Sequence, residues 1–464
     1  MIPFTEVAVL DRNSEYRGVP PLQLMENAGK ALASEIENRY KESPVLFVCG
    51  TGNNGGDGYV AARYLSEWRK PDHITVYLIK GREAVNHGIA KENLERLECN
   101  ITDEMPRDIP SECIIVDGIL GTGIKGAVRE PYRSIIKSIN GSNNPVVSID
   151  IPSGLGADIQ VDPDLTVTFH DVKEGMDGDN SGEIIVKDIG IPQEAIENTG
   201  PGELLLYPVP GKDTHKGNNG TLLVIGGGPY TGAPALAAIA AYRTGADLVH
   251  LAVPSKASRI VAGYSPSFIV HTLEGDELDE SHVDQILKIS ENCDAVLIGP
   301  GLGDKENTLK AVKKIIESLE LPLVIDADAL KALRSNLPKM NAVLTPHQGE
   351  FNMIAGDISV DEYARESVVT VLLKGQEDYI SDGNRKKIND FGTPAMTVGG
   401  TGDTLAGVVG TLLTKGLSHF DAARLGAYIT AKAGEFAFDK SNWGLMPEDV
   451  SECIPLVLRE LIKG

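Results

Sequence analysis

The sequence predicts two α/β domains, each built on a parallel sheet with helices on both faces. In each half of the chain, short apolar runs rich in β-branched residues alternate with stretches of helical periodicity. Between the halves, around 205–220, proline and glycine gather and the helical pattern disappears. A chain of 464 residues also exceeds the size of one ordinary domain. We therefore predict domains at 1–208 and 209–464.

The first half opens with helical periodicity over 20–40 and continues as strands separated by helical stretches. Apolar runs of this kind are typical of parallel strands buried on both faces. The last two predicted strands, 165–169 and 182–191, have no long helix between them and are expected to close one edge of the sheet. The earlier predicted strands cover 44–50, 73–79, 113–119 and 145–151, and a second helix is predicted over 58–68.

The second half repeats the alternation and ends in helices. A small-residue helix over 233–246 follows the first strand, and two closing helices are predicted over 401–416 and 421–438. The predicted strands begin the segments 221–228, 248–254, 295–303, 321–330, 342–351 and 368–375.

Composition narrows the functional class. A formal charge of -23 argues against non-specific binding to nucleic acid or to an anionic membrane, which requires clustered Lys and Arg. No apolar run reaches the length of a membrane span, and residues 1–16 lack the pattern of a signal peptide. Five scattered cysteines without C-x-x-C spacing predict neither a disulfide framework nor a zinc site. A cytoplasmic protein acting on small molecules is the expectation.

Two glycine loops follow strands of the first half. Gly50–Gly55 (GTGNNG) and Gly121–Gly126 (GTGIKG) both match the G-x-G-x-x-G of a dinucleotide turn, and both would lie at the carboxyl edge of the sheet. The acid that should bind a ribose about 20 residues later is missing, and Asp57 would repel a pyrophosphate placed deep in the first loop. Asp57 either caps a helix beginning at Gly58 or contacts a ligand.

Further polar residues end neighbouring strands of this sheet. Asn54, Asp117, Asp150 and Ser153 bring amide, carboxylate and hydroxyl oxygens to one edge, which suits a hard cation or acid–base chemistry. Asp150 is the best candidate for proton transfer, because a carboxylate at a partly buried strand end is a common general acid or base. Its alternative role is to cap a helical turn in the PSGL segment that follows.

The second half carries its own glycine-rich turn. Gly399, Gly400 and Gly402 precede a helix expected to open at Asp403 or Thr404, and such a turn offers free N–H groups to a phosphate. It is not a P-loop, because G-x-x-x-x-G-K-[ST] is absent. Asp403 is placed as a base towards a hydroxyl near that phosphate, or simply caps the helix. Other strand ends of this half carry further candidate residues: Lys374, His347 with Glu350, and Gly301 with Gly303.

Over residues 10–195 the segments LMENAG, GTGNNGGDG, VDGILGTGIKG, SIDIPSGL and TVTFHDVKEGM, in this order, resemble the NAD(P)H-hydrate epimerases. The resemblance implies a Rossmann-like fold and interconversion of the two C6 epimers of hydrated NAD(P)H, with K⁺ near the substrate. It implies Asn54, Asp117 and Ser153 as potassium ligands. It places around the substrate Asn53, Asn54, Gly55, Gly56, Asp57, Gly121, Thr122, Gly123, Ile124, Lys125, Gly126, Ala127 and the catalytic Asp150. Ser181 and Gly156 depart from the residues expected at their positions.

Over residues 213–460 the segments HKGNNGTLLVIGG, YTGAPALAA, GPGLG, VIDADAL, LTPHQGEF, LLKG and GGTGDTLAG resemble the NAD(P)H-hydrate dehydratases. This resemblance implies a ribokinase-like fold, Mg²⁺, and ADP as co-substrate, the ADP inferred from the fused arrangement. It implies an assembly such as a tetramer or octamer. The substrate would contact Ala233, Gly303, His347 and the catalytic Asp403, and the nucleotide Lys374, Gly375, Gln376, Glu377, Asp378 and Gly402.

Together the two resemblances imply a bifunctional metabolite-repair enzyme, an isomerase joined to a lyase, acting on NADH and NADPH hydrates. Two other interpretations stay open from the residues. One is a ribokinase-like small-molecule kinase with an accessory domain, in which Asp403 activates a substrate hydroxyl. The other is a dinucleotide sensor that binds in both clefts without turnover.

Overall fold

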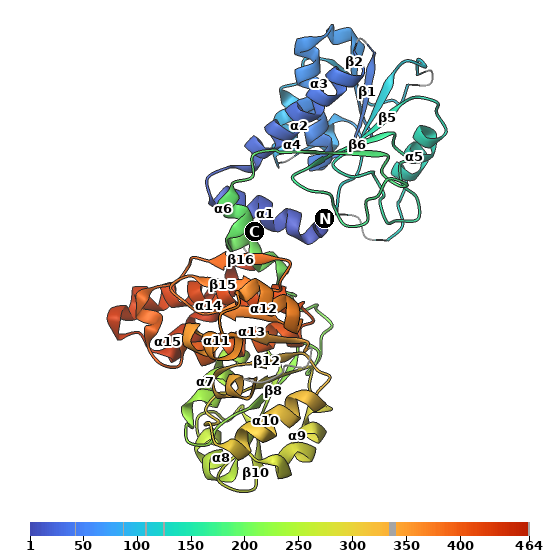
Figure 1. The fold of residues 1–464 in the computed structure, drawn as a ribbon. Helices are drawn as coiled ribbons and strands as arrows, with labels where there is room; N and C mark the ends of the chain where they lie inside the picture. The colour runs from blue at the N-terminus through green and yellow to red at the C-terminus, as the bar shows by residue number, and fades with distance from the viewer. Residues whose placement is uncertain (42, 87, 107–108, 124–125, 334–339, 463–464) are drawn as a thin grey trace. The chain divides into compact units, whose positions relative to one another are not determined.

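The computed structural model describes residues 1–462 apart from 42, 87, 107–108, 124–125 and 334–339. The chain divides into two compact units, Met1–Ala195 and Ile196–Gly464, each with its own sheet (Figure 1). The segment 196–208, which we placed with the first domain, bonds to the second unit: Thr199 N donates to Ile388 O at 2.8 Å. The domain limit at 208/209 itself stays a prediction.

The N-terminal unit contains a parallel sheet of seven strands in the order β3-β2-β1-β4-β5-β6-β7. The first six follow the strand order of a Rossmann sheet, so the fold expected for this half is confirmed. The two predicted edge strands are also confirmed, as β6 and β7. The strands are β1 (Val45–Cys49), β2 (Ile74–Leu78), β3 (Asn100–Thr102), β4 (Ile114–Gly118), β5 (Val146–Ile149), β6 (Leu165–Phe169) and β7 (Glu183–Lys187).

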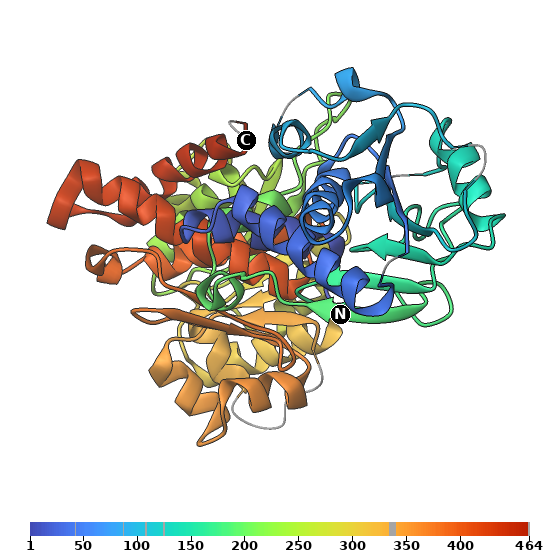
Figure 2. The same cartoon turned by 90° about the horizontal axis from the view of Figure 1, so that it is seen from above.

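Alternate residues of the central strands pack into two separate cores, because successive side chains of a strand point to opposite faces. Phe47 and Cys49 of β1 face α2 and α3, which lie side by side (Figures 1 and 2), whereas Leu46 and Val48 face α5. Cys49 is thus a buried apolar contact, as expected of a free cysteine. The helices are α1 (Phe4–Tyr16), α2 (Pro21–Arg39), α3 (Asn53–Trp68), α4 (Gly88–Glu95) and α5 (Tyr132–Asn140), and the short α6 (Gln193–Glu197) spans the division between the units.

The C-terminal unit contains a nine-stranded sheet in the order β10-β9-β8-β11-β12-β13-β14-β15-β16. The first seven strands are parallel, and a β14-β15-β16 meander completes the edge in antiparallel fashion. The strands are β8 (Thr221–Ile225), β9 (Leu248–Pro254), β10 (Ile269–Leu273), β11 (Ala295–Ile298), β12 (Leu323–Ile325), β13 (Ala342–Leu344), β14 (Thr370–Leu373), β15 (Asp378–Ser381) and β16 (Lys386–Asn389).

Helices cover both faces of this second sheet. One core packs α7 (Gly232–Arg243), α8 (Ser255–Ala262), α13 (Thr401–Thr414), α14 (His419–Ser441) and α15 (Pro447–Leu458) on the sheet. The opposite core packs α9 (Val283–Ser290), α10 (Glu306–Ser318), the 3₁₀ segment η5 (Ala327–Leu333), α11 (Gln348–Ala355) and α12 (Val360–Ser367). Within the described residues no helix combines the length and apolarity that a membrane crossing requires.

Candidate active sites

The first glycine loop joins β1 to α3 at the carboxyl edge of the N-terminal sheet. Its glycines permit close backbone packing: a Cβ on Gly50 would lie 2.0 Å from the carbonyl oxygen of Ile119, and one on Gly55 would lie 2.3 Å from that of Gly50. Asn54 Nδ2 donates to the carbonyl oxygen of Leu120 at 3.1 Å. The β1 loop is therefore held against the β4 loop at the point where the strand order reverses, the usual ligand position in such sheets.

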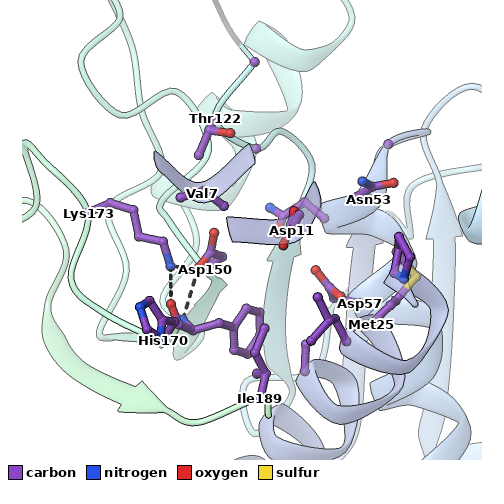
Figure 3. A pocket seen from close by; sticks show the side chains of 18 of the residues that line it. Val7, Asp11, Met25, Asn53, Asp57, Thr122, Asp150, His170, Lys173 and Ile189 are labelled. Carbon is purple, nitrogen blue, oxygen red and sulfur yellow. Dashed lines mark hydrogen bonds and ion pairs between the residues drawn. The ribbon is translucent and has the colours of Figure 1, made fainter. Parts of the chain in front are cut away.

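A cavity of about 500 Å³ lies at this edge, within the size range of small-molecule sites (Figure 3). The predicted residues that line it are Asn53, Asn54, Asp57, Gly121, Thr122, Gly123 and Asp150. Sequence reasoning did not single out several other polar and apolar lining residues, among them Asp11, Met25, His170, Lys173 and Ile189.

Other predicted residues lie outside the cavity wall. Gly56 serves packing, because a Cβ there would lie 2.6 Å from Met25 Cε. Gly126 and Ala127 are exposed and do not line the cavity, while Ile124 and Lys125 fall outside the described residues. Since α3 begins at Asn53, the idea that Asp57 caps a helix from Gly58 is wrong: Asp57 stands in the second turn, facing the cavity.

Asp150 is held in a strained and highly bonded position at the end of β5. Its φ of 62° is left-handed, a conformation that a non-glycine residue adopts at an energetic cost and often at functional sites. Its Oδ1 accepts hydrogen bonds from Lys173 Nζ, from Phe169 N at 3.1 Å and from Thr168 Oγ1 at 3.2 Å. All of these donors lie in residues 168–173 and none in the 152–155 turn, so the alternative role of Asp150 as a cap of that turn is wrong.

Lys173, in the segment that follows β6, holds the Asp150 carboxylate in place. Its side chain is 2% exposed and also donates to Phe169 O at 2.6 Å and to Thr168 Oγ1 at 2.9 Å. The Asp150 side chain keeps 18% exposure towards the cavity. A buried ammonium with three oxygen acceptors therefore fixes a charged carboxylate at the cavity surface.

Two further carboxyl groups share the cavity with this ion pair (Figure 3). Burial, and then the negative charge of Asp150, raise the pKa of Asp11 to about 6, against the opposing effect of Lys173. Burial and the carboxylates of Asp150 and Asp11 raise the pKa of Asp57 well above its ordinary value. The cavity thus combines a fixed carboxylate with two carboxyl groups whose pKa values are raised.

Asp117 and Ser153 lie beneath the cavity, fully buried. Asp117 accepts from Ser153 Oγ at 2.5 Å, from Ser153 N at 2.9 Å and from Ser148 Oγ at 2.8 Å. Ser153 Oγ accepts in turn from Leu120 N at 2.9 Å, and Leu120 O accepts from Asn54. The structure therefore brings Asn54, Asp117 and Ser153 together around the backbone of Leu120. Their side chains form a cluster of oxygen atoms of the kind that can bind a cation.

In the C-terminal unit, the glycine-rich turn and Lys374 meet at one edge of the sheet. Gly400, with a φ of 107°, precedes α13, which begins at Thr401 rather than at Asp403 or Thr404. A Cβ on Gly402 would lie 3.3 Å from Lys374 Nζ, so the ammonium faces the N-terminus of this helix. Lys374 Nζ donates to Asp326 Oδ1 at 2.9 Å, and that buried carboxylate also accepts from Thr345 Oγ1 at 2.8 Å.

Asp403 lies in the first turn of α13 beside this pair. Burial, followed by the charge of Asp326, raises the pKa of Asp403 to about 7, while Lys374 opposes the rise. A carboxyl that titrates near neutrality is well suited to accept a proton from a substrate hydroxyl.

A second cavity of about 370 Å³ lies next to these residues and is lined by Asp328, Lys331, His347 and Glu350. His347 both caps a helix and faces the cavity. Its Nδ1 caps α11 by accepting from Gly349 N at 3.0 Å, yet its side chain is 62% exposed and lines the cavity. Asp328 accepts from Gly303 N at 2.8 Å, which places that predicted residue beside the cavity.

The remaining predicted residues of this half lie on adjoining loops. Gly301 and Gly303 pack against the 229–230 segment, three residues before Ala233 in the first turn of α7. Gly375 N donates to Asp378 Oδ1 at 3.2 Å, which closes the tight turn that contains Gln376 and Glu377. Of the predicted nucleotide-binding residues, Gly402 thus lies beside the Lys374 ammonium, and residues 375–378 form the turn that follows Lys374.

Sequence reasoning missed Asp11, Lys173, Asp326 and Asp328 as members of these sites. Lys173, Asp326 and Asp328 lie in the segments TVTFHDVKEGM and VIDADAL, whose polar residues follow strands, so their position past a strand end was an available signal. Asp11 lies on a helix outside the sheet and offered no such signal. Across the described chain, no three His, Cys, Asp or Glu side chains form a preassembled metal site.

Both units place glycine-rich turns and a titratable carboxyl at the carboxyl edge of a parallel sheet, which defines a class of two-domain α/β enzymes with small-molecule sites. A hypothetical protein from Streptococcus mutans covers 57% of this chain and 99% of its own length, with a TM-score of 0.51 and 23% identity. A ribokinase-like superfamily protein from Enterococcus faecalis gives the same TM-score and identity, covering 57% of this chain and 95% of its own length. These likenesses show the ribokinase-like fold.

The family follows from the sequence comparisons. The family model described as NAD(P)H-hydrate dehydratase matches residues 222–456, and that of the YjeF-related protein N-terminus matches residues 21–175. The "Bifunctional NAD(P)H-hydrate repair enzyme Nnr" of Methanothermobacter thermautotrophicus is 43% identical over 98% of this chain and 94% of its own length. The protein of the same name from Archaeoglobus fulgidus is 37% identical over 97% of both chains. The chain belongs to the family of bifunctional NAD(P)H-hydrate repair enzymes.

Proposed function

We propose that this chain repairs hydrated NAD(P)H in two steps: the N-terminal unit epimerises the (R)-hydrate to the (S)-hydrate, and the C-terminal unit dehydrates the (S)-hydrate with a nucleoside diphosphate, ADP. The observation that carries the proposal is the full-length similarity to enzymes with this printed name. It is joined to a cavity lined by Asp150 in the N-terminal unit and, in the C-terminal unit, to a cavity lined by Asp328, which acts electrostatically on Asp403.

In the N-terminal unit we assign proton transfer at the C6 substituent to Asp150. Lys173 holds the Asp150 carboxylate at the cavity surface, where it can accept a proton from water. The lining residues Asn53, Asn54, Asp57 and 121–123 would bind the nicotinamide hydrate from the surrounding loops.

The oxygen cluster beneath this cavity fits a potassium ion, a hard cation that takes several oxygen ligands. Asn54 uses its amide nitrogen on Leu120 O, which leaves its amide oxygen for the ion, and Asp117 and Ser153 add carboxylate and hydroxyl oxygens. A bound K⁺ would supply positive charge beside the substrate. The epimerase rate should therefore rise with KCl when NaCl keeps the ionic strength constant, and an unchanged rate would refute this assignment.

In the C-terminal unit we assign the role of base to Asp403. It would take the proton of the C6 hydroxyl while the terminal phosphoryl group of the nucleotide is transferred to that oxygen. The ring nitrogen lone pair then expels the phosphate as a C6–N1 double bond forms, and loss of a proton from C5 to solvent moves the double bond to C5–C6 and gives NAD(P)H. Lys374 and the N-terminus of α13 would bind the phosphates, and carboxylates of this edge such as Asp326 and Asp328 fit Mg²⁺, which is usually bound by one or two carboxylates together with substrate phosphates.

One assay tests both assignments. A mixture of (R)- and (S)-NADH hydrate with ADP and Mg²⁺ should regain its full absorbance at 340 nm with the wild-type chain. The variant Asp403→Asn should slow recovery about 100-fold, and Asp150→Asn should recover the (S)-epimer only, apart from spontaneous epimerisation. Recovery of both epimers at the wild-type rate by either variant would refute the corresponding role.

The same assay separates the other interpretations. A small-molecule kinase would leave the spectrum unchanged and accumulate a phosphorylated alcohol from ATP. A sensor would bind the hydrate in calorimetry without any spectral change.

A further inference from the structure

We infer that Asp11 is a second catalytic carboxyl of the N-terminal unit, which faces the reacting C6 atom from the side opposite Asp150. The inference rests on the proposed epimerase function and names a residue on α1, outside the 21–175 segment that the family model matches.

The position of α1 over the sheet edge is fixed by backbone bonds. Ile2 N donates to Val172 O at 2.9 Å, and Glu174 N donates to Ile2 O at 2.9 Å. These bonds join the start of the chain to the segment that carries Lys173, so α1 and the ion pair at Asp150 are positioned by the same short strand contact.

Residues of α1 form a wall of the cavity. Val7, Leu10 and Asp11 line it from this helix, whereas Asp150 lines it from the end of β5 in the sheet (Figure 3). A nicotinamide hydrate ring bound between α1 and the sheet edge would have Asp11 on one side and Asp150 on the other.

The Asp11 carboxyl differs from that of Asp150 in its bonding. Asp150 receives three donors on one oxygen. Among the described residues no hydrogen bond or ion pair is found for the Asp11 carboxyl, which is partly exposed at the cavity wall. The carboxyl is therefore available to a ligand that enters the cavity.

Epimerisation at C6 needs a proton donor and a proton acceptor on opposite faces of the ring. Asp11 donates its proton to the C6 hydroxyl, the C–O bond breaks as the N1 lone pair forms the C6–N1 double bond, and water leaves. A second water attacks C6 from the other face, and Asp150 takes its proton. The ring nitrogen regains its lone pair, the epimer is formed, and a proton returns from Asp150 to Asp11 through the solvent-open cavity.

The charges around Asp11 agree with a proton donor. The groups that face it are Asp57 from α3, Asp150 from β5, and Lys173 and His170 from the segment after β6. Burial and Asp150 hold the pKa of Asp11 at about 6, so the proton is present in the weakly acidic range.

The test uses the full chain, (R)-NADH hydrate, ADP and Mg²⁺, with recovery at 340 nm as the readout and the chain's own dehydratase as the coupling step. Asp11→Asn should lower kcat for the (R)-hydrate at least 100-fold, with KM changed less than threefold. The fall of kcat above about pH 6 in the wild type should also disappear. Asp11→Glu should regain part of the rate. Glu15→Gln removes an exposed acid from the same helix and should leave the rate unchanged.

Two measurements keep the outcomes distinct. Turnover of pure (S)-hydrate by Asp11→Asn should equal that of the wild type, and the thermal midpoint of its N-terminal unit at pH 8 should rise, since a costly buried charge is removed. A wild-type chain that does not accelerate (R)-hydrate consumption refutes the proposed function itself. An active wild type with an Asp11→Asn kcat within threefold, or a loss of rate that follows from unfolding, refutes the role of Asp11.

Discussion

The ion pair between Lys173 and Asp150 offers a direct test of how the N-terminal cavity is built. Lys173→Met keeps the length and apolar bulk of the side chain but removes the ammonium from three acceptors: Asp150, Thr168 and Phe169 O. Breaking one partner of a buried ion pair typically costs about 3–5 kcal/mol. Because Asp150 keeps 18% exposure and its bond from Phe169 N, we expect the lower end, about 3 kcal/mol.

The two tryptophans allow this loss to be measured in the full chain. Trp68 is in the N-terminal unit and Trp443 in the C-terminal unit, so a Trp443→Phe background leaves Trp68 as the sole tryptophan reporter of N-terminal unfolding. For a unit of this size, about 3 kcal/mol corresponds to a drop of about 6–12 °C in the thermal midpoint. Epimerase activity should fall together with stability, and dehydratase activity on the (S)-hydrate should not change.

The double variant Lys173→Met/Asp150→Asn is the matched control. It removes the unpaired charge as well as its partner, so it should regain at least about 1.5 kcal/mol of the loss while remaining inactive as an epimerase. A midpoint shift below 2 °C for Lys173→Met, or a double variant no more stable than the single one, would refute the view that this pair is a buried and coupled charge pair.

Three further predictions concern single residues. The dehydratase kcat should rise with pH through about 7, because Asp403 becomes a base when it loses its proton there, and Asp403→Asn should lower kcat about 100-fold and abolish that rise. The pKa of Asp57 is raised in the folded state, so its contribution to stability is complete below the unfolded pKa near 4 and is lost as pH rises through the folded pKa. Asp57→Asn should therefore raise the thermal midpoint reported by Trp68 at pH 8 and leave it unchanged at pH 3. Thermal melts at the two pH values measure this. Gly407→Ala in α13 should destabilise the C-terminal unit by about 1–3 kcal/mol in spite of better helix propensity, since the new Cβ would lie 2.1 Å from Ala237 O; an increase in the denaturant midpoint would contradict this packing.

Much of the architecture could be predicted because it depends on local patterns. The β-branched runs become strands buried on both faces, and the weak strand β3 was missed because its three residues are partly exposed and carry little apolar signal. The start of α3 was placed too late, at Gly58 instead of Asn53, since glycines in its first turn hide helical periodicity. The helical pattern of 401–416 matched the start of α13 at Thr401, whereas the glycine-turn argument placed that start at Asp403 or Thr404. The β15–β16 hairpin was missed as well, because polar residues alternate with few apolar ones there.

The sequence by itself determined the two α/β units, the edges where their sites lie and the carboxyls at strand ends, Asp117, Asp150 and the helix-start Asp403. These follow from alternation and from the rule that parallel strands end at one edge, which are properties of neighbouring residues. Only the tertiary structure showed that Asp117 is fully buried in a hydrogen-bonded cluster and that Lys173 forms an ion pair with Asp150. It alone brought Asp11 from a helix outside the sheet into the cavity. Burial and the distances between residues far apart in the chain control these charges, and no local pattern encodes either quantity.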